Sequence, residues 1–372
     1  MHPRCRVRNN LASADLTWAG TSLLLACVAC GDSSPSTPAA GTTSGTATAT
    51  DGTTIHEPDT TASLDDTTSA ERGWVEEPDI DGAWGAFYSV WGEAPDDLWI
   101  AGGRMFDDGG SEGVLVHGDG STWTRVKLDP STPVLSWVGP AGDDVWVVGA
   151  EGTCLRREGD AWVRHETGDA RRLWGVWGAA TDDVWAVGGN GIDDLPALLH
   201  FDGTQWSEQV LPKLESNALF KVWGRSGDDV WVVGDGGVVL HYDGDAWELV
   251  ANESVADLIG VHGSGDVLFT VGGRANGRVA RLSDAGADGE TLAVPGLAGV
   301  WVDANGRATV AGDLGTLGTL EPGASSIALD ETNTILLLHA VHGFDDGPRW
   351  AVGGDLVNAA PAFGIVLRHD GP

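Results

Sequence analysis

The sequence predicts an all-β fold, a single seven-bladed β-propeller of four-stranded antiparallel blades. Three observations lead to this prediction. A unit of about 42 residues, rich in Trp and Gly, repeats from residue 73 to the end of the chain. Each copy divides into short apolar runs, and a segment ahead of the first copy matches the run that the last copy lacks. Repeats of this length holding four strands each are typical of propellers.

The fourth copy shows the unit best. Its four apolar runs are residues 219–223, 230–233, 238–242 and 246–250. The segments between these runs read GRSGDD, GDGG and DGD. Gly accepts positive φ and Asp tolerates it, so these segments are suited to tight turns. The copy therefore predicts four short strands joined by turns.

One Gly closes the second run in every copy and indicates the number of blades. It occurs at intervals of 47, 39, 46, 38, 40 and 41 residues, at Gly102, Gly149, Gly188, Gly234, Gly272, Gly312 and Gly353. The run ahead of it carries an aromatic residue in six copies, with Thr309 as the exception: Trp99, Trp146, Trp185, Trp231, Phe269 and Trp350.

Two further sets of equivalent positions, in the first and fourth runs, are occupied mainly by Trp. The first run carries Trp91, Trp177, Trp223 and Trp301, with His262 and His342 as substitutes and an inverted order, Trp137-Val138, in the second copy. The fourth run begins with Trp123, Trp162, Trp206 and Trp247, and is poorly preserved in copies five and six. Large Trp side chains fill gaps between blades that are buried on both faces. The position before the first-run Val is small in five copies, as expected near a crowded axis, and Lys221 breaks this pattern and could face the channel.

The last copy lacks a fourth run, and the N-terminal side of the repeat region supplies it. Residues 71–76 place Trp74 as the fourth-run Trp is placed elsewhere. We expect a strand at about residues 73–77 to complete the last blade, because closing the ring removes two unpaired sheet edges.

Residues 1–29 are interpreted as a lipoprotein signal peptide. Arg4, Arg6 and Arg8 precede an apolar stretch that is too short to span a bilayer. The stretch ends at a Cys and then turns polar, which resembles the lipobox of bacterial lipoproteins, where the Cys thiol is diacylated. Cys30 is the expected lipid-bearing residue. Cys27, whose upstream Leu fits the lipobox better, is the alternative, and cleavage without lipidation is a third interpretation.

Residues 30–72 are predicted to form a lipidated, disordered tether, followed by the propeller at residues 73–372. Residues 31–72 contain 18 Ser or Thr and show no apolar period. Such a segment cannot bury enough apolar surface to offset the entropy lost on ordering. Once the signal is removed and Cys30 carries lipid, Cys154 is the one thiol left, so we expect no intramolecular disulfide.

The aligned repeats resemble those of exported lipoproteins of the myxobacterial type, whose repeats read VWG, DDVWAVG and DGxxW. The resemblance covers residues 73–372. Single copies, such as the second copy's DDVWVVGAEGTCLRREGDAW, are similar to tectonin repeats, which implies glycan or lipopolysaccharide binding. A weaker similarity links the DGxxW hairpin to the Asp-box of sialidase-like propellers. None of these families transfers a catalytic residue onto this sequence.

The charge excludes several classes of partner. The formal net charge is −34, from 55 acidic and 21 basic residues. Nucleic acids and anionic lipid surfaces attract cationic faces, so neither is an expected partner. We expect a monomer that needs no cofactor and reaches the membrane through its lipid anchor alone.

No metal site is expected. Acidic pairs such as Asp96-Asp97 occupy the turns between first and second runs, where hydrogen bonds to the turn backbone explain them and calcium is the alternative. His117, His200 and His241 share one third-run position, but equivalent positions on adjacent blades lie about 15 Å apart, too far for a shared metal. Arg residues fill this column in other copies, which indicates a solvated outer position.

Catalysis is not expected either. The two tyrosines, Tyr88 and Tyr242, fall inside strand patterns, and Cys154 aligns with core positions. No nucleophile elbow, zinc-protease pair or phosphate-binding loop occurs in the sequence. An outer Trp such as Trp123 or Trp247 could stack on sugars.

Loops on one rim are the candidate binding face, because loops on rigid scaffolds carry recognition. The connections between second and third runs share the rim opposite the acidic pairs, and they lengthen in copies one, three and seven. The candidate ligand-binding residues are Arg104, Met105, Phe106, Asn190, Ile192, Asn358 and Phe363.

The sequence thus predicts an exported protein, lipid-anchored to the cell envelope at the outer membrane or cell surface. The leading hypothesis is a non-enzymatic interaction module that presents one rim to an envelope protein or polymer. A tectonin-like lectin that binds glycan is the alternative, and a degenerate sialidase-like hydrolase is a remote one.

Overall fold

The computed structural model describes residues 73–189, 195–355 and 363–371. All of them belong to one compact unit, and a second unit, Gly20–Glu71, lies outside the described residues. The predicted signal peptide, Cys27, Cys30 and the tether also lie outside them. Among the residues that are described, no helix is both long enough and apolar enough to cross a membrane.

Seven four-stranded repeats make up the described structure, and each runs from an inner to an outer strand. The first strands are β2 (Ala86–Ala94), β6 (Leu135–Ala141), β10 (Leu173–Ala180), β14 (Leu219–Ser226), β18 (Leu258–Ser264), β22 (Leu297–Val302) and β26 (Leu337–Gly343). The second strands are β3 (Asp97–Met105), β7 (Asp144–Gly149), β11 (Asp183–Gly188), β15 (Asp229–Gly234), β19 (Val267–Gly272), β23 (Ala308–Gly312) and β27 (Arg349–Gly354).

The outer strands are shorter. The third strands are β4 (Ser111–Gly118), β8 (Cys154–Glu158), β12 (Ala197–Phe201), β16 (Val239–Tyr242), β20 (Arg278–Ser283), β24 (Leu317–Leu320) and β28 (Gly364–His369). The fourth strands are β5 (Trp123–Arg125), β9 (Ala161–Arg164), β13 (Trp206–Glu208), β17 (Trp247–Leu249), β21 (Gly286–Thr291), β25 (Ala328–Leu329) and, for the last repeat, β1 (Val75–Glu76). Three single-turn 3₁₀ helices lie in connections: η1 (Gly82–Trp84), η2 (Asp235–Gly237) and η3 (Asp313–Gly315).

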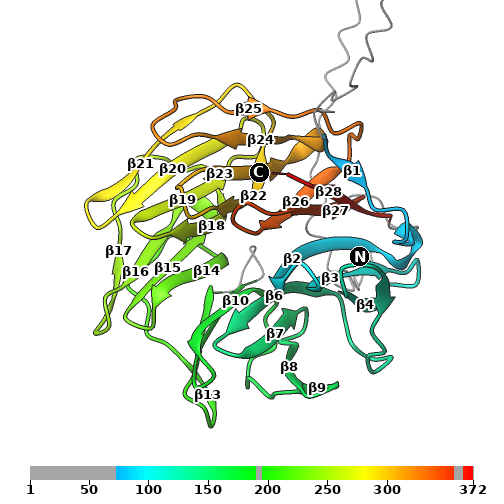
Figure 1. Cartoon of the computed structure of the whole chain (residues 1–372). Helices are drawn as coiled ribbons and strands as arrows, with labels where there is room; N and C mark the ends of the chain where they lie inside the picture. The colour runs from blue at the N-terminus through cyan, green and yellow to red at the C-terminus, as the bar shows by residue number, and fades with distance from the viewer. Residues whose placement is uncertain (1–72, 190–194, 356–362, 372) are drawn as a thin grey trace, which may run out of the picture. The chain divides into compact units, whose positions relative to one another are not determined.

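The strands form five four-stranded sheets and one eight-stranded sheet. The eight-stranded sheet consists of repeats 2 and 3, which are joined by a single parallel pairing of Gly178 with Ala141. Every other pairing between named strands is antiparallel and connects neighbours within one repeat (Figure 1). The prediction of an all-β propeller is therefore confirmed. The number of seven blades stays a prediction. It is consistent with the eight-stranded sheet being two four-stranded repeats joined by one pairing.

The first strands line the centre of the ring. β2, β6, β10, β14, β18, β22 and β26 each contact the next, and β26 contacts β2 again (Figure 1). In every repeat, the pairing of the first strand shifts its register directly after the residue that pairs with the Gly closing the second strand. The residue at the shift forms a β-bulge, which changes the direction of its side chain.

The ring is closed by its N-terminal strand, as predicted. Val75 pairs with Arg368 and Glu76 with Leu367, and the Glu77 amide donates to the Val366 carbonyl at 2.9 Å. Trp74 is 5% exposed and packs in the core of the last repeat and its neighbour. β28 thus has a partner on both sides.

The Gly that closes the second strand of each repeat is required because the backbone of the first strand approaches it closely. A Cβ on Gly353 would lie 1.8 Å from the Leu337 carbonyl oxygen, and one on Gly272 would lie 2.0 Å from the Asp257 carbonyl oxygen. The other five equivalent glycines meet the corresponding carbonyl, at or directly before the start of their own first strand, at 2.1 to 2.4 Å. Real Cβ atoms do not approach this closely, so only Gly allows the second strand to reach the first.

The outer Trp column lies deeper than the sequence indicated. Trp206 and Trp247 are each 9% exposed, so little of the Trp247 ring is accessible for the stacking on sugars that the sequence allowed. Trp123 is half-buried and packs against the core that contains Trp350. Each of these rings fills the space between two repeats, where burial of aromatic area stabilises the ring.

Candidate functional site: the loop rim and the mouth of the axis

The antiparallel repeats give the ring two different rims. The acidic rim carries the turns between first and second strands and the hairpins between third and fourth strands. The loop rim carries the connections between second and third strands and between one repeat and the next. The loop rim is the one on which the candidate binding residues were predicted.

The acidic pairs of the acidic rim act differently from the prediction. Hydrogen bonds to the turn backbone were expected, but the second Asp of four pairs instead holds a basic side chain of the third strand. His117, His200 and His241 lie 2.7, 2.7 and 2.9 Å from their Asp partners, and Arg156 pairs with Asp144 in the same way. These side chains are half-buried rather than solvated.

The Asp partner positions each His over a second-strand Trp. The His117 and Trp99 ring centroids are 4.3 Å apart, and those of His241 and Trp231 are 4.0 Å apart with nearly parallel planes. The third-strand His column is therefore part of the packing. Among the described residues no group of three His, Cys, Asp or Glu side chains could hold a metal ion.

The hairpins of the acidic rim hold their carboxylates in the charged form. Asp202 accepts hydrogen bonds from the Thr204 hydroxyl and amide and from the Gln205 amide. These bonds lower the pKa of Asp202 to about 2, and bonds from Thr122 and Ser121 lower the pKa of Asp119 similarly. This rim is therefore charged and well solvated.

Exposed apolar side chains gather on the loop rim. Of twelve large hydrophobic residues that are exposed, eight lie in or beside its connections: Met105, Phe106, Leu195, Val210, Val255, Leu314, Ile335 and Phe363. The other four lie on fourth strands at the outer edge: Val75, Val163, Leu249 and Leu329. Within the described ranges none lies on the acidic rim. Apolar side chains that cluster on one face mark interaction sites in soluble proteins.

Four of the predicted residues lie in or beside loop-rim connections, Arg104, Met105 and Phe106 in repeat 1 and Phe363 in repeat 7. Met105, Phe106 and Phe363 are 51%, 39% and 46% exposed. The segment of η1 lies near both repeats, because a Cβ on Gly82 would meet the Phe363 ring and one on Gly85 would meet the carbonyl of Gly103 in β3. Repeats 7 and 1 therefore both contribute exposed apolar side chains to the loop rim beside η1.

Arg104 contacts both the Phe106 ring and an acidic side chain. Its guanidinium pairs with Glu112 at 2.6 Å and lies 5.1 Å from the centre of the Phe106 ring. The two arginines beside Glu112, Arg104 and Arg125, outweigh the effect of burial and lower the pKa of that carboxyl. Arg104 thus positions Phe106. The remaining candidates, Asn190, Ile192 and Asn358, lie outside the described residues.

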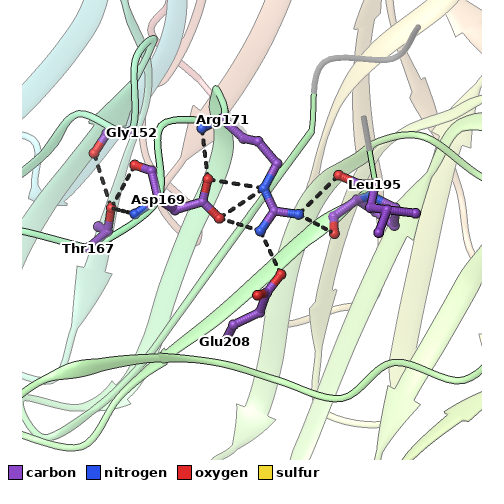
Figure 2. A network of polar contacts seen from close by, with 7 residues as sticks. Gly152, Thr167, Asp169, Arg171, Leu195 and Glu208 are labelled. Carbon is purple, nitrogen blue, oxygen red and sulfur yellow. Dashed lines mark hydrogen bonds and ion pairs between the residues drawn. The ribbon is translucent and has the colours of Figure 1, made fainter. Parts of the chain in front are cut away.

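A polar network anchors the base of the long connection in repeat 3. Arg171 donates to the carbonyls of Leu195 and Pro196 at 3.1 and 3.0 Å and pairs with Asp169 and Glu208, as Figure 2 shows. Burial opposes ionisation of Asp169, but the hydrogen bonds from Arg171 prevail and lower its pKa. Leu195, which is 78% exposed, therefore projects from a fixed base.

Two large side chains meet in the axial column. Trp137 occupies the position of Ser89 and Gly175 in the pairing with the second strand. The inverted order assumed for the second copy is therefore wrong: Trp137 stands in the axial column and Gly139 in the interblade column. Lys221 lies in the same axial column, and its ammonium is 3.7 Å from the centre of the Trp137 ring.

Lys221 is 5% exposed and donates to the Trp174 carbonyl at 3.1 Å. Burial lowers the pKa of its ammonium to about 7, while the Trp137 ring and the Trp174 carbonyl favour the charged form. Burial also lowers the pKa of His339 to about 3, and the nearby Lys221 adds to this effect.

Bulge residues form the mouth of the axis on the loop rim. Tyr88, Trp174, Phe220 and His339 all stand at the bulge of their first strand. The Tyr88 and His339 rings meet edge to face at 5.3 Å, and the His339 Nδ1 lies 2.8 Å from the Tyr88 carbonyl oxygen. Of the residues near the axis, only Lys221 was predicted from the sequence. The bulge residues could have been found as large residues that stand directly before the small axial position in several repeats.

Comparisons with known proteins agree with the architecture. The solved structure of "YCF48 bound to D1 peptide" is 16% identical, with a TM-score of 0.58 over 81% of this chain and 97% of that one. YCF48 from Cyanidioschyzon merolae is 13% identical, with a TM-score of 0.59 over 80% of this chain and 98% of that one. The likeness establishes a propeller fold. No protein-family model matches the chain, and no curated protein matches it in sequence.

Proposed function

We propose that the chain is a non-enzymatic protein-interaction module that binds a segment of a partner protein on its loop rim. The observation that carries this proposal is the separation of the two rims: exposed apolar side chains gather on one, whereas the other is lined by solvated carboxylates. Apolar surface drives association, and solvated carboxylates resist burial.

The structural neighbour that was solved with a peptide supports a peptide as the type of ligand. In the present chain the apolar surface at Met105, Phe106 and Phe363 adjoins η1, and Arg171 fixes a second apolar point at Leu195. We expect an extended segment with apolar residues to lie on this surface. A rigid scaffold limits the entropy lost on binding.

The proposed setting is the cell envelope. We propose that residues 1–29 direct export, that Cys30 or Cys27 carries lipid, and that residues 31–72 act as the tether. A flexible coil of this length spans about 35 Å root-mean-square, which allows the propeller to reach partners beyond the lipid surface. Palmitate labelling tests the anchor. Label that persists in both single variants, Cys30→Ala and Cys27→Ala, would show that neither Cys is uniquely used.

The rim proposal is tested by a variant that removes its apolar surface. We would replace Met105, Phe106 and Phe363 by Ser in the full chain and capture partners from the native envelope by cross-linking. Complete burial of such a side chain contributes about 1.5–3 kcal/mol, and roughly half of each is exposed. Replacing the three side chains should therefore reduce the free energy of binding by about 3 kcal/mol, and the affinity for the identified partner should fall about 100-fold.

The matched control removes a similar area elsewhere. Val163, Leu249 and Leu329 are 37%, 53% and 57% exposed on outer strands, and their replacement by Ser should leave affinity unchanged. Equal capture by the rim variant and the wild type would refute the proposal. Binding to a glycan array without any protein partner would replace it with a lectin function.

A further inference from the structure

The outer Trp column follows a regular packing rule. The fourth-strand Trp of one repeat packs on the second-strand Trp of the preceding repeat. Trp162 lies 5.2 Å from Trp99, and Trp247 lies 5.1 Å from Trp185, measured between ring centroids. Trp206 packs on Trp146 at 5.5 Å in the same edge-to-face manner. At these junctions an indole fills the space between neighbouring sheets.

Two repeats lack the fourth-strand Trp of this rule, and the repeat that precedes Trp74 carries Thr309 in place of the second-strand Trp. Ala287 pairs with Leu282 and so stands in the Trp position of repeat 5. Gly318 pairs with Leu329 and Thr319 with Ala328 in repeat 6, which places Ile327 in the Trp position opposite Leu320. The two departures have different outcomes.

The junction between repeats 4 and 5 is closed without a Trp. The Trp231 ring is 0% exposed and packs in a cluster that includes Leu282 and Ala287. The junction between repeats 5 and 6 is open. There Phe269, Val279, Arg281, Leu292 and Leu320 line a cavity of about 380 Å³, within the range of sites that take small organic groups.

This cavity lies where the junctions of repeats 1 with 2, 2 with 3 and 3 with 4 hold an indole. Phe269 takes the place of the second-strand Trp, and among the described residues no aromatic ring packs on it. The Arg281 guanidinium lies 5.2 Å from the centre of the Phe269 ring. An aromatic ring that enters the cavity would therefore contact an aromatic ring and lie near a cation. At the junction of repeats 1 and 2, Trp162 likewise packs on Trp99, a ring that also lies 4.9 Å from the Arg157 guanidinium.

Arg281 lacks the carboxylate that its equivalents have. In repeats 1 to 4 the second strand begins with Asp, whereas β19 begins with Val267. No ion pair of Arg281 occurs within the described part of the chain. Asp288, Glu290 and Glu321 line the opening of the cavity, so its rim is acidic overall.

We propose that the cavity between repeats 5 and 6 binds a tryptophan side chain of a partner protein, with a basic residue next to it in the partner's sequence. The indole enters beside Ile327 and lies against Phe269, with the Arg281 guanidinium at its edge. The carboxylates at the opening accept the indole N–H and attract the neighbouring cation. This site lies between outer strands, so it is separate from the loop rim and does not depend on the function proposed for that rim.

The test uses the full chain and a dye-labelled peptide of sequence Lys-Trp-Lys with blocked ends, followed by fluorescence polarisation. Ile327→Trp fills the cavity from within and should weaken binding at least tenfold. Leu329→Trp adds the same side chain two residues further along at an exposed position and should leave binding unchanged. Arg281→Ala, at an exposed residue, removes the stacking cation and should weaken binding about fivefold even if the Ile327 variant fails to fold.

A second peptide separates the indole from charge. Lys-Ala-Lys carries the same charge and should bind at least tenfold more weakly than Lys-Trp-Lys. Equal binding of the two peptides, or undiminished binding of Lys-Trp-Lys to both the Ile327→Trp and Arg281→Ala variants, would overturn the proposal.

Discussion

Trp74→Ala should weaken the point at which the ring closes. Trp74 is 5% exposed and packs with Trp301, Leu338 and Ile365, and its indole N–H donates to Asp330 at 2.9 Å. Truncation of a buried Trp costs about 3–5 kcal/mol. Asp330 is exposed, so water can replace the lost donor and the hydrogen bond adds little to this cost.

The expected change in melting temperature follows from the size of the domain. A domain of about 300 residues unfolds with an entropy of roughly 0.6 kcal/mol/K, so a loss of about 4 kcal/mol lowers Tm by about 6 °C. Differential scanning calorimetry measures this shift. Hydrogen exchange should show faster exchange first in β1 and β28, because these two strands pair with each other.

The matched control is Trp162→Ala, which removes a half-buried Trp from the same column of repeat 2. It should lower Tm by less and should leave exchange in β28 unchanged. An unaltered Tm for Trp74→Ala, or equal exchange in β28 for both variants, would refute the argument that β1 holds the last repeat in the ring.

Three further predictions follow from the described residues. Gly353→Ala places a Cβ 1.8 Å from a backbone oxygen and should cost several kcal/mol by urea denaturation, whereas Gly73→Ala, which meets nothing within 4 Å, should change stability by less than about 0.5 kcal/mol. Burial holds the pKa of Lys221 near 7, below its unfolded value of about 10.4. Between these two pH values the unfolded state therefore binds more protons than the folded state. The free energy of unfolding of the wild type, relative to that of Lys221→Met, should rise from about pH 7 to about pH 10, by at most about 1.4 kcal/mol per pH unit. A difference in unfolding free energy that does not vary with pH would contradict this prediction. Burial raises the pKa of the Cys154 thiol, so iodoacetamide should label it only in denaturant, as mass spectrometry can show.

The repeat architecture could be predicted because its constraints lie in single columns of the sequence. Gly353 and its six equivalents are required by one backbone contact, and Trp74 could be aligned with the fourth-run Trp. Each of these columns has one chemical identity, so its spacing is visible without any coordinates.

The candidate site was only partly predictable. Exposed apolar side chains such as Leu195, Val255 and Ile335 stand in connections that have no common length or motif. The axial position of Trp137 depends on a bulge, and a bulge changes which face a residue occupies without leaving a mark in the apolar pattern. The pairing of Asp97 with His117 joins two strands and could not be seen from one turn.

The pairing of Val75 with Arg368 has a consequence for biogenesis. Of the strands in the described ranges, β1 is synthesised first, yet its sheet partner there, β28, is synthesised last. The native ring can therefore assemble only after the whole domain has left the ribosome. Until then the edge of β28 that β1 covers stays unpaired, so the sheet of the last repeat is the last to be completed.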